Sequence, residues 1–308
     1  MAITAPDITA SVVRARLQGQ KADIGGAAFR FLLIACLTIV LAALVALITS
    51  VSGKGIEVFS TRGVADFIQR PFSIRPQLAG VYQGIVGTVT CAVIVALFAF
   101  PLGLATAIYL EEYASGNWFT RMVDIVIRNL AGVPSVVYGL LGYAVFVKGP
   151  FNSVTGGSSV LSAGLTLSIL VLPIVVITSA EAIRAVPTNL REGGFGIGAT
   201  RWEVTRTLVL PNALPGVLTG TILGLARALG EAAPLILVGA STSGFSGGDP
   251  GDLTGRFTAL PNLISTWSKL PPRNWTGNTQ AAILVTLVLV LGINAVGIIL
   301  RTRFEKKK

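Results

Sequence analysis

The chain has 308 residues, of which 52% are hydrophobic and only 12% are charged. Soluble domains carry about 25% charged residues, so this composition excludes an ordinary soluble globular protein. The sequence contains no His, which excludes His-based metal sites and a Ser-His-Asp triad. Both cysteines, Cys36 and Cys91, lie in apolar runs, so neither a disulfide framework nor a thiolate metal site is expected. We therefore predict no catalytic residue, no metal and no cofactor in this chain.

Six apolar stretches are long enough to cross about 30 Å of hydrocarbon, which takes about 20 helical residues. They cover approximately residues 28–51, 80–110, 122–147, 161–185, 212–241 and 279–300. No small-residue cleavage site follows the first stretch, so we expect a retained span and not a cleaved signal peptide. The second stretch is longer than a straight crossing needs, and Pro101 is its predicted kink. The predicted fold is an all-α, six-span integral membrane protein.

Apart from Arg227, which lies within the fifth stretch, the 24 basic residues cluster at the ends of these stretches, which argues against nucleic-acid binding despite the net charge of +10. A cytoplasmic N-terminus places the larger group inside: Arg14, Arg16, Lys21, Arg30, Arg121, Arg128, Arg184, Arg191, Arg201, Arg206, Arg301, Arg303, Lys306, Lys307 and Lys308. The smaller group then lies outside: Lys54, Arg62, Arg70, Arg75, Lys148, Arg256, Lys269 and Arg273. This asymmetry predicts both termini in the cytoplasm.

The predicted domain organisation follows from this orientation. A cytoplasmic N-terminal segment, 1–27, precedes a membrane domain, 28–300, and a basic cytoplasmic tail, 301–308. The predicted external loops, 52–79 and 242–278, are long and rich in Gly, Pro and Ser.

The predicted cytoplasmic loop between the fourth and fifth spans covers residues 186–211. Thr200-Arg201-Trp202-Glu203 has the spacing of a capping box, and the helix that it begins is expected to end at Pro211. A short helix is expected near Thr188, interrupted by the Gly-rich stretch 193–198. The loop is either an ordinary capped connector or a helix–turn–helix that docks into a groove of another protein.

Three features of this loop match the spacing of the EAA loop of ABC importer permeases: Glu192-Gly193-Gly194, Gly198 and Leu208-Val209-Leu210-Pro211. The sequence therefore resembles that family, with Gly-Gly in place of the usual Ala-Ala. The resemblance implies the fold of type I ABC importer permeases and coupling helices that seat in a cytoplasmic ATPase subunit. The implied coupling residues are Glu192, Gly193, Gly194, Gly198, Leu210 and Pro211. Because Gly costs about 1 kcal/mol relative to Ala in a helix, the Gly-Gly pair weakens the expected first helix.

Four other segments resemble the phosphate permeases (PstA type) of this family: Asn129–Ser135, Glu181–Pro187, Ala226–Glu231 and Phe257–Pro261. The resemblance runs from about residue 80 to residue 300. It implies one half of a translocation pore for inorganic phosphate in the bacterial plasma (inner) membrane. The implied partners are a homologous PstC-type permease, two copies of a PstB-type ATPase that binds ATP and Mg, and a PstS-type phosphate-binding protein.

No G-x-x-x-x-G-K-[ST] motif occurs in the sequence, so this chain is not expected to hydrolyse ATP through a P-loop. Two alternatives remain open at this point. One is an ABC permease for another oxyanion, such as sulfate or molybdate. The other is an ion-coupled secondary transporter, which would need no ATPase and often has an inverted repeat, although no convincing repeat is visible here.

Arg227 and Glu231 lie in the fifth predicted span, four residues apart and so on one helix face. Charges at membrane depth are costly unless they are paired or hydrated. The two residues form either a self-neutralising structural pair or an anion site, in which the Arg227 guanidinium binds an oxyanion and Glu231 is its partner. Pro134 and Ser135 mark either a simple kink or a discontinuous helix that lines the substrate path.

Glu181 and Arg184 lie at the predicted cytoplasmic end of the fourth span. We interpret them as an ion pair at the membrane surface and not as part of a binding site.

Overall fold

The computed structural model describes residues 24–240 and 252–305. Most of the predicted N-terminal segment, part of the predicted loop 242–278 and the last three residues of the basic tail lie outside the described residues. The described residues form helices and their connections, with no β-strand among them. The chain divides into two compact units, residues 1–51 and 52–308.

The first unit contains most of α2 (Ile24–Arg62), which continues into the second unit. The long uncharged run after Phe31 makes this helix apolar on every side, as expected for a helix in a membrane. Residues 25–62 are long and apolar enough to cross a bilayer, which agrees with the first predicted span.

The second unit contains the remaining helices. They are α3 (Val64–Gln69), α4 (Tyr82–Ile108), the π-helical turn η1 (Tyr109–Tyr113), α5 (Trp118–Ala131), α6 (Ser135–Gly142), the π-helical turn η2 (Tyr143–Val147), α7 (Asn152–Thr155), α8 (Val160–Arg184), α9 (Thr188–Gly196), α10 (Arg201–Val204), the π-helical turn η3 (Thr205–Val209), α11 (Leu210–Gly230), α12 (Ala233–Val238), α13 (Leu260–Trp267) and α14 (Pro272–Glu305).

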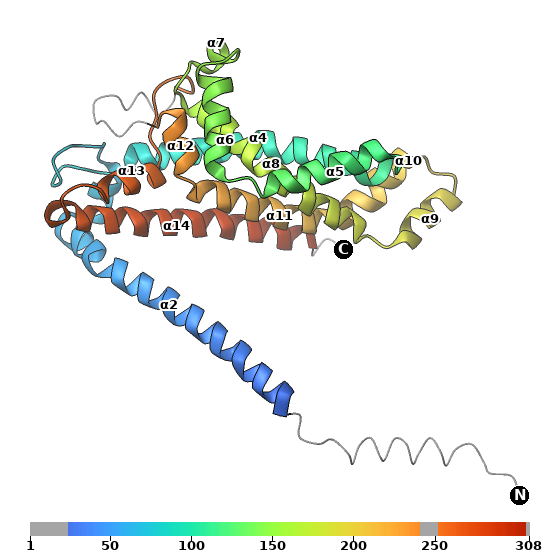
Figure 1. Ribbon diagram of the computed structural model, residues 1–308, viewed down its shortest axis with the longest axis horizontal. Coiled ribbons are helices and arrows are strands. Elements are labelled where there is room, and N and C mark those ends of the chain that lie inside the picture. The colour runs from blue at the N-terminus through green and yellow to red at the C-terminus, as the bar shows by residue number, and fades with distance from the viewer. Residues whose placement is uncertain (1–23, 241–251, 306–308) are drawn as a thin grey trace, which may run out of the picture. The chain divides into compact units, whose positions relative to one another are not determined.

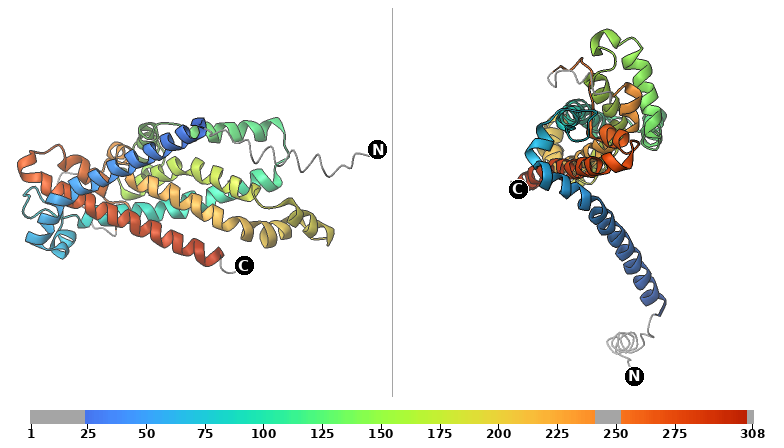
Figure 2. Two further views of the ribbon diagram at one scale, coloured as in Figure 1. Left: turned by 90° about the horizontal axis from the view of Figure 1, so that it is seen from below. Right: turned by 90° about the vertical axis from the view of Figure 1, so that its left-hand side faces the viewer.

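Within this unit α8 packs against α4 and α11, and α11 packs against α14 (Figures 1 and 2). The turn between α9 and α10 lies at one end of this bundle, here called the α9 end, and α13 lies at the opposite end, the α13 end (Figure 1). This arrangement places the predicted coupling loop at one end, and α3 and α13, which belong to the two predicted external loops, at the other.

Small residues allow the long helices to approach closely. A Cβ atom at Gly220 of α11 would lie 2.0 Å from the Thr178 hydroxyl oxygen of α8, and one at Gly164 of α8 would lie 2.6 Å from Ile94 of α4. The Thr178 hydroxyl donates to the Ile174 carbonyl at 2.9 Å, so it needs no partner from water. Close packing and internally satisfied polar groups are what a bilayer requires of its helices.

Among the described residues, five helices are long and apolar enough to span a membrane, and a bent pair makes a sixth candidate. The five single helices cover Gly25–Arg62, Tyr82–Tyr113, Val160–Arg184, Arg201–Gly230 and Asn274–Arg303. The predicted all-α, multi-span fold is therefore confirmed. Pro101 lies inside α4, which runs through it without a break.

The third predicted span, 122–147, is a bent pair and not one helix. Trp118–Ala131 and Ser135–Val147 meet at an angle of 102°. Gly132 follows the last residue of α5, and Pro134 caps the start of α6. Pro134 has no N–H to donate to the Leu130 carbonyl, which accepts instead from the Val133 N–H at 3.1 Å in a tighter final turn.

The fifth predicted span, 212–241, has the wrong limits at both ends. The helix begins at Arg201 and runs through Pro211, which does not end it as predicted. The π-helical turn η3 directly precedes α11. A π-helical turn is wider than an α-helical turn, and it accommodates Pro211, which has no backbone N–H to donate to a preceding carbonyl. At the other end α11 stops at Gly230, and Glu231 continues the chain in an extended conformation, with φ −82° and ψ 118°.

Candidate functional site

The loop between α8 and α11 forms the short helix α9 and, after a turn, the start of the continuous helix Arg201–Gly230, so the two predicted helix starts are present but the second helix does not end at Pro211. The capping box is confirmed: the Thr200 N–H donates to Glu203 Oε2 at 2.8 Å, and the Glu203 N–H donates to the Thr200 hydroxyl at 3.3 Å. Gly198, which turns the chain between the helices, has φ of +82°, a value that favours glycine. The turn at Gly198 and the capping box at Thr200 together define a helix–turn–helix.

The first of these helices, α9, is not interrupted at Gly193 and Gly194 but continues to Gly196. Gly194 is buried, and an added Cβ would lie 2.7 Å from Val204 Cγ2 and 3.0 Å from Leu208 Cδ1. The expected weakness of the Gly-Gly pair is offset here, because the missing side chain lets α9 pack directly on the following helix. At Gly193 an added Cβ would meet nothing within 4 Å.

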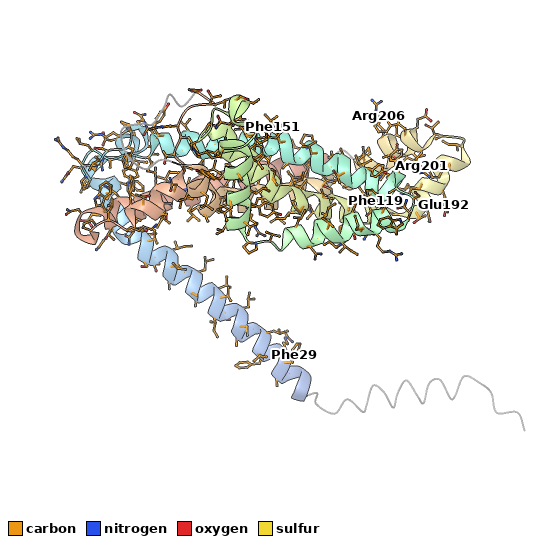
Figure 3. The ribbon with its side chains drawn as sticks, turned by 45° about the horizontal axis from the view of Figure 1, so that its top comes forward. Phe29, Phe119, Phe151, Glu192, Arg201 and Arg206 are labelled. Atoms are coloured by element: carbon orange, nitrogen blue, oxygen red, sulfur yellow. The ribbon has the colours of Figure 1, made fainter. Side chains whose placement is uncertain are left out.

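The surface of this loop is apolar as well as charged. Leu190, Phe195, Ile197 and Trp202 have exposed fractions of 37%, 47%, 87% and 55%. Figure 3 shows Glu192, Arg201 and Arg206 at the same end of the bundle. Leu210 and Pro211, also predicted to be coupling residues, are the first two residues of α11.

The predicted pair Glu181–Arg184 is replaced by another pair. The Arg184 Nε donates to Glu111 Oε2 at 3.2 Å, and a second guanidinium nitrogen contacts Glu111 Oε1. Sequence analysis did not single out Glu111 or its neighbour Glu112, which lie in η1. The sequence did contain a signal for them, because two adjacent acidic residues stand at the end of an apolar run.

The structure brings Arg227 and Glu231 near each other, with 3.8 Å between Arg227 Nε and Glu231 Oε1. This distance is within ion-pair range but too long for a hydrogen bond. The two residues are not on one continuous helix as predicted, because Glu231 follows the last residue of α11 with φ −82° and ψ 118°. The Arg227 side chain is 50% exposed and the Glu231 side chain 21%, so the guanidinium has donors available for another group.

At Pro134 and Ser135 the structure has a discontinuous helix and not a simple kink. Ser135 is the first residue of α6 and is partly buried. The Tyr138 hydroxyl donates to the Leu130 carbonyl at 2.8 Å, on the far side of the break. This hydrogen bond joins α6 to the end of α5 across the break.

The two short helices that follow the two breaks pack on each other. An added Cβ at Gly139 of α6 would lie 2.8 Å from the Pro234 Cα of α12 and 2.8 Å from Leu237 Cδ1. Both breaks therefore belong to one region of the bundle, which contains Pro134, Ser135, Arg227 and Glu231. Polar groups at interrupted helices are a recurrent way to build a transport site in a membrane.

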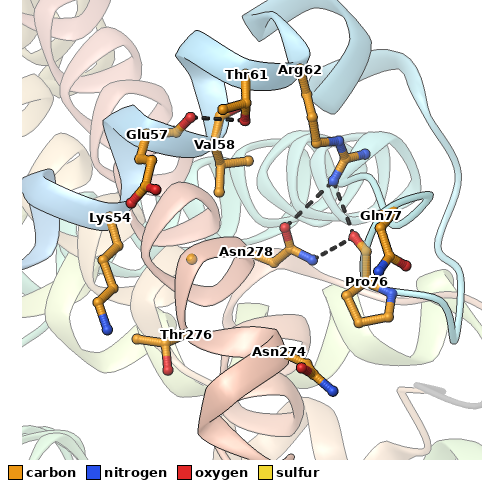
Figure 4. Close-up of a pocket in the computed structure, with 11 residues that line it drawn as sticks. Lys54, Glu57, Val58, Thr61, Arg62, Pro76, Gln77, Asn274, Thr276 and Asn278 are labelled. Carbon is orange, nitrogen blue, oxygen red and sulfur yellow. Dashed lines mark hydrogen bonds between the residues drawn. The ribbon is translucent and has the colours of Figure 1, made fainter.

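A separate cavity of about 650 Å³ lies at the α13 end (Figure 4). Its lining includes Lys54, Glu57 and Asn274, and the Asn278 amide and Arg62 guanidinium both donate to the Pro76 carbonyl, at 2.8 Å and 3.1 Å. The predicted path residues lie elsewhere in the bundle, so this cavity is not the predicted site.

Comparison with known proteins shows the family. The family model described as "Binding-protein-dependent transport system inner membrane component" matches residues 99–308. The "Phosphate transport system permease protein PstA" of Mycobacterium leprae (strain TN) is 37% identical over 220 residues, 71% of this chain and 69% of that protein. The "Probable ABC transporter permease protein YqgH" of Bacillus subtilis (strain 168) is 34% identical over 264 residues, 83% of this chain and 84% of that protein. The "Phosphate transport system permease protein PstC" of Xylella fastidiosa (strain 9a5c) is 34% identical over 224 residues, 66% of this chain and 69% of that protein.

Solved structures show the same fold. A subunit of the inward-facing MetNI methionine ABC transporter has a TM-score of 0.58 at 20% identity, over 73% of this chain and 95% of that one. A subunit of a bacterial ABC transporter for the polysaccharide alginate has a TM-score of 0.59 at 15% identity, over 96% of this chain and 99% of that one. The membrane helices, the fold and the family match agree: the chain is a multi-pass membrane protein and belongs to the family of binding-protein-dependent transport system inner membrane components.

Proposed function

We propose that this chain is the PstA-type permease subunit of an ATP-driven importer of inorganic phosphate and forms half of its translocation pore. The observation that carries the proposal is the similarity to phosphate permeases over about 70% of the chain, at 34–37% identity. The Arg227 guanidinium beside two interrupted helices supports an oxyanion as the substrate, because its planar donors match a tetrahedral oxyanion.

The assembly would contain a homologous PstC-type permease, two PstB-type ATPase subunits that hold ATP and Mg, and a PstS-type phosphate-binding protein. The exposed helix–turn–helix at the α9 end, with Glu192 and Gly198, would seat in the ATPase. The α9 end and both termini would therefore face the cytoplasm of a bacterial cell, with the α13 end outside the inner membrane. No reaction is assigned to this chain itself, and the energy comes from the ATPase.

Alternating access is the mechanism that this arrangement favours. Closure of the ATPase dimer would move α9 and α10, and the spans would rock so that the path opens to the other side. Arg227 would bind the anion, with Glu231 as its ionic partner and Pro134 and Ser135 beside the path. The 3.8 Å separation of Arg227 and Glu231 leaves the pair loose enough for phosphate to enter and leave.

The test is transport by the reconstituted complex. The chain is co-expressed with the three partner subunits from its own genome and incorporated into proteoliposomes with ATP on the ATPase side. We expect uptake of radiolabelled phosphate that requires ATP and the binding protein and that excess sulfate does not compete away. Phosphate flux without the ATPase would contradict the proposal and indicate a secondary transporter. Equal transport of sulfate or molybdate would contradict the assigned substrate.

A further inference from the structure

The segment Tyr109–Tyr113 extends α4 at the α9 end as the π-helical turn η1, and three consecutive side chains of this turn contact three arginines. Glu111 contacts Arg184 at the end of α8, and Glu112 contacts Arg191 in α9. The Tyr113 ring lies under the guanidinium of Arg201 at the start of α10, with 6.0 Å from the guanidinium carbon to the ring centroid. One turn of the second span is thus in contact with both helices of the coupling loop.

Of the three arginines, Arg191 is the one whose guanidinium donates to backbone carbonyls as well as to its carboxylate partner. Arg191 Nη2 lies 2.8 Å and Nε 3.1 Å from Glu112 Oε1. The same guanidinium donates to the carbonyls of Ile183 and Val186, at 2.9 Å and 2.7 Å. Arg191 therefore joins α9 both to the end of α8 and to the extension of α4.

Burial distinguishes this pair from its neighbour. The side chains of Glu112 and Arg191 are 7% and 18% exposed, whereas those of Glu111 and Arg184 are 16% and 58% exposed, so only the second pair has a partner that water reaches freely. Exposed ion pairs contribute little because water screens them, while removing one partner of a buried pair leaves an uncompensated charge. The Glu112–Arg191 pair should hold α9 firmly, and the Glu111–Arg184 pair should not.

We propose that Glu112 and Arg191 are positioning residues that pass the displacement of the coupling helix α9 directly to the second span, α4. This inference rests on the proposed function. The chain links α9 to α8 through residues 185–187 and to the helix that begins at Arg201 through residues 197–200, but it does not link α9 to α4. The ion pair adds a connection to α4, a helix that packs on both α8 and α11. Since α11 carries Arg227, the movement reaches the candidate path from two sides.

The test compares Glu112→Gln with Glu111→Gln in the complete complex in proteoliposomes, with radiolabelled inorganic phosphate. Both substitutions remove one carboxylate charge and keep the side-chain shape. Because Glu112→Gln leaves the Arg191 charge without its ionic partner, it should lower the phosphate transported per ATP hydrolysed by about tenfold. The ATPase should remain bound and active, and Glu111→Gln should stay within about twofold of the unchanged protein.

A spectroscopic measurement separates transmission of movement from simple stability. Spin labels are placed at Tyr109 and Ile197, which are 59% and 87% exposed, after Cys36 and Cys91 are replaced by Ala. We expect one narrow distance distribution with and without ATP, since the turn and the loop move together. In Glu112→Gln the distribution should broaden, and in Glu111→Gln it should not. If Glu112→Gln does not insert, Arg191→Lys, which keeps the charge but loses the fork, replaces it in both measurements.

An unchanged ratio of phosphate to ATP in Glu112→Gln, or an unchanged distance distribution, would overturn this inference. The label measurement without nucleotide needs only the folded chain. It therefore reports on the pair even if the complex carries no phosphate, a result that would instead contradict the proposed function.

Discussion

Glu231 Oε1 lies 3.8 Å from Arg227 Nε across the point where α11 ends, so the pair joins a helix terminus to the extended segment that follows it. A pair within one helix turn would hold a fixed geometry. Here the carboxylate belongs to a segment between two helices, α11 and α12, and the pair can change its separation without unwinding either helix. This relationship fits a charge pair whose two side chains separate when an anion binds, and substitution of either residue tests that role.

Arg227→Lys is expected to keep the charge and lose the planar donor fork. Bidentate recognition of an oxyanion depends on that fork, so phosphate flux should fall by about tenfold while assembly stays near normal. The measurement is ATP-driven phosphate uptake in proteoliposomes, with co-purified ATPase as the check on assembly. Arg75→Lys, in an exposed loop residue, is the control. Uptake at the unchanged rate in Arg227→Lys would leave Arg227 with a structural role or a role as a charge alone.

Glu231→Gln is expected to narrow the preference for phosphate over sulfate. At neutral pH phosphate keeps at least one P–OH, which an ionised carboxylate can accept as a hydrogen bond, whereas sulfate offers only bare oxygens that the carboxylate repels. Removing the charge removes the penalty on the wrong anion. The ratio of the two fluxes must be measured with the binding protein bypassed, because its own selectivity would mask the effect. A constant ratio would return Glu231 to the role of a neutralising partner for Arg227.

Tyr138→Phe tests the interrupted third span. The Leu130 carbonyl accepts from the Val133 N–H at 3.1 Å, and the Tyr138 hydroxyl, at 2.8 Å, is a second donor that joins α6 to the end of α5. Loss of this hydrogen bond should destabilise the break by about 1 kcal/mol and lower phosphate flux, without releasing the ATPase. Tyr143→Phe, at a tyrosine that is 40% exposed in the following turn, is the matched control. Equal thermal stability and flux in the two variants would remove the assigned role of Tyr138.

Gly193→Ala and Gly194→Ala should have opposite effects on α9. At Gly193 nothing lies within 4 Å of an added Cβ. Alanine there should therefore stabilise the helix by about 1 kcal/mol through its higher propensity. At Gly194 the new atom would lie 2.7 Å from Val204 Cγ2, and Val204 has little rotamer freedom. Overpacking of this kind costs about 1–3 kcal/mol. Thermal unfolding of the purified complex measures both, and equal shifts would contradict the assigned packing.

Gly198→Val should disrupt the turn between the two coupling helices by backbone strain alone. An added Cβ at Gly198 meets nothing within 4 Å, yet φ is +82°, which costs a residue with a side chain about 1–2 kcal/mol. We expect an inserted, folded chain whose ATPase is lost or hydrolyses ATP without uptake. Glu192→Lys should give the same result through charge reversal on an exposed side chain. Full ATPase retention with unchanged uptake in both variants would contradict the docking role of the loop.

The sequence by itself determined the class of the protein and the position of most spans. Long apolar runs have one stable environment, the bilayer, and there the backbone must satisfy its own hydrogen bonds, so helices follow from composition. The capping box at Thr200 was equally predictable from the sequence, because its two residues, Thr200 and Glu203, are three positions apart. Local signals of this kind need no tertiary contact to be formed.

Only the tertiary structure decided which prolines interrupt a helix. Pro101, Pro173 and Pro215 lie inside continuous helices, whereas Pro134 marks a bend of 102°. Each proline removes one backbone donor, and its local sequence does not reveal whether neighbouring helices hold the chain straight or let it turn. At Pro134 the packing of α6 on α12 and the Tyr138 hydroxyl stabilise the bent form.

The partners of the arginines were also decided by packing. Arg184 was expected to pair with Glu181 and pairs with Glu111 instead, and Arg191 binds Glu112, which is 79 residues away in the sequence. A guanidinium has several donors and can bind any acidic residue that packing brings within reach. Sequence spacing identifies only those acidic residues that lie near the arginine on the same helix. The contact between α4 and α8 brings η1 to the end of α8 and to α9, and it is this contact that gives Glu111 and Glu112 their partners.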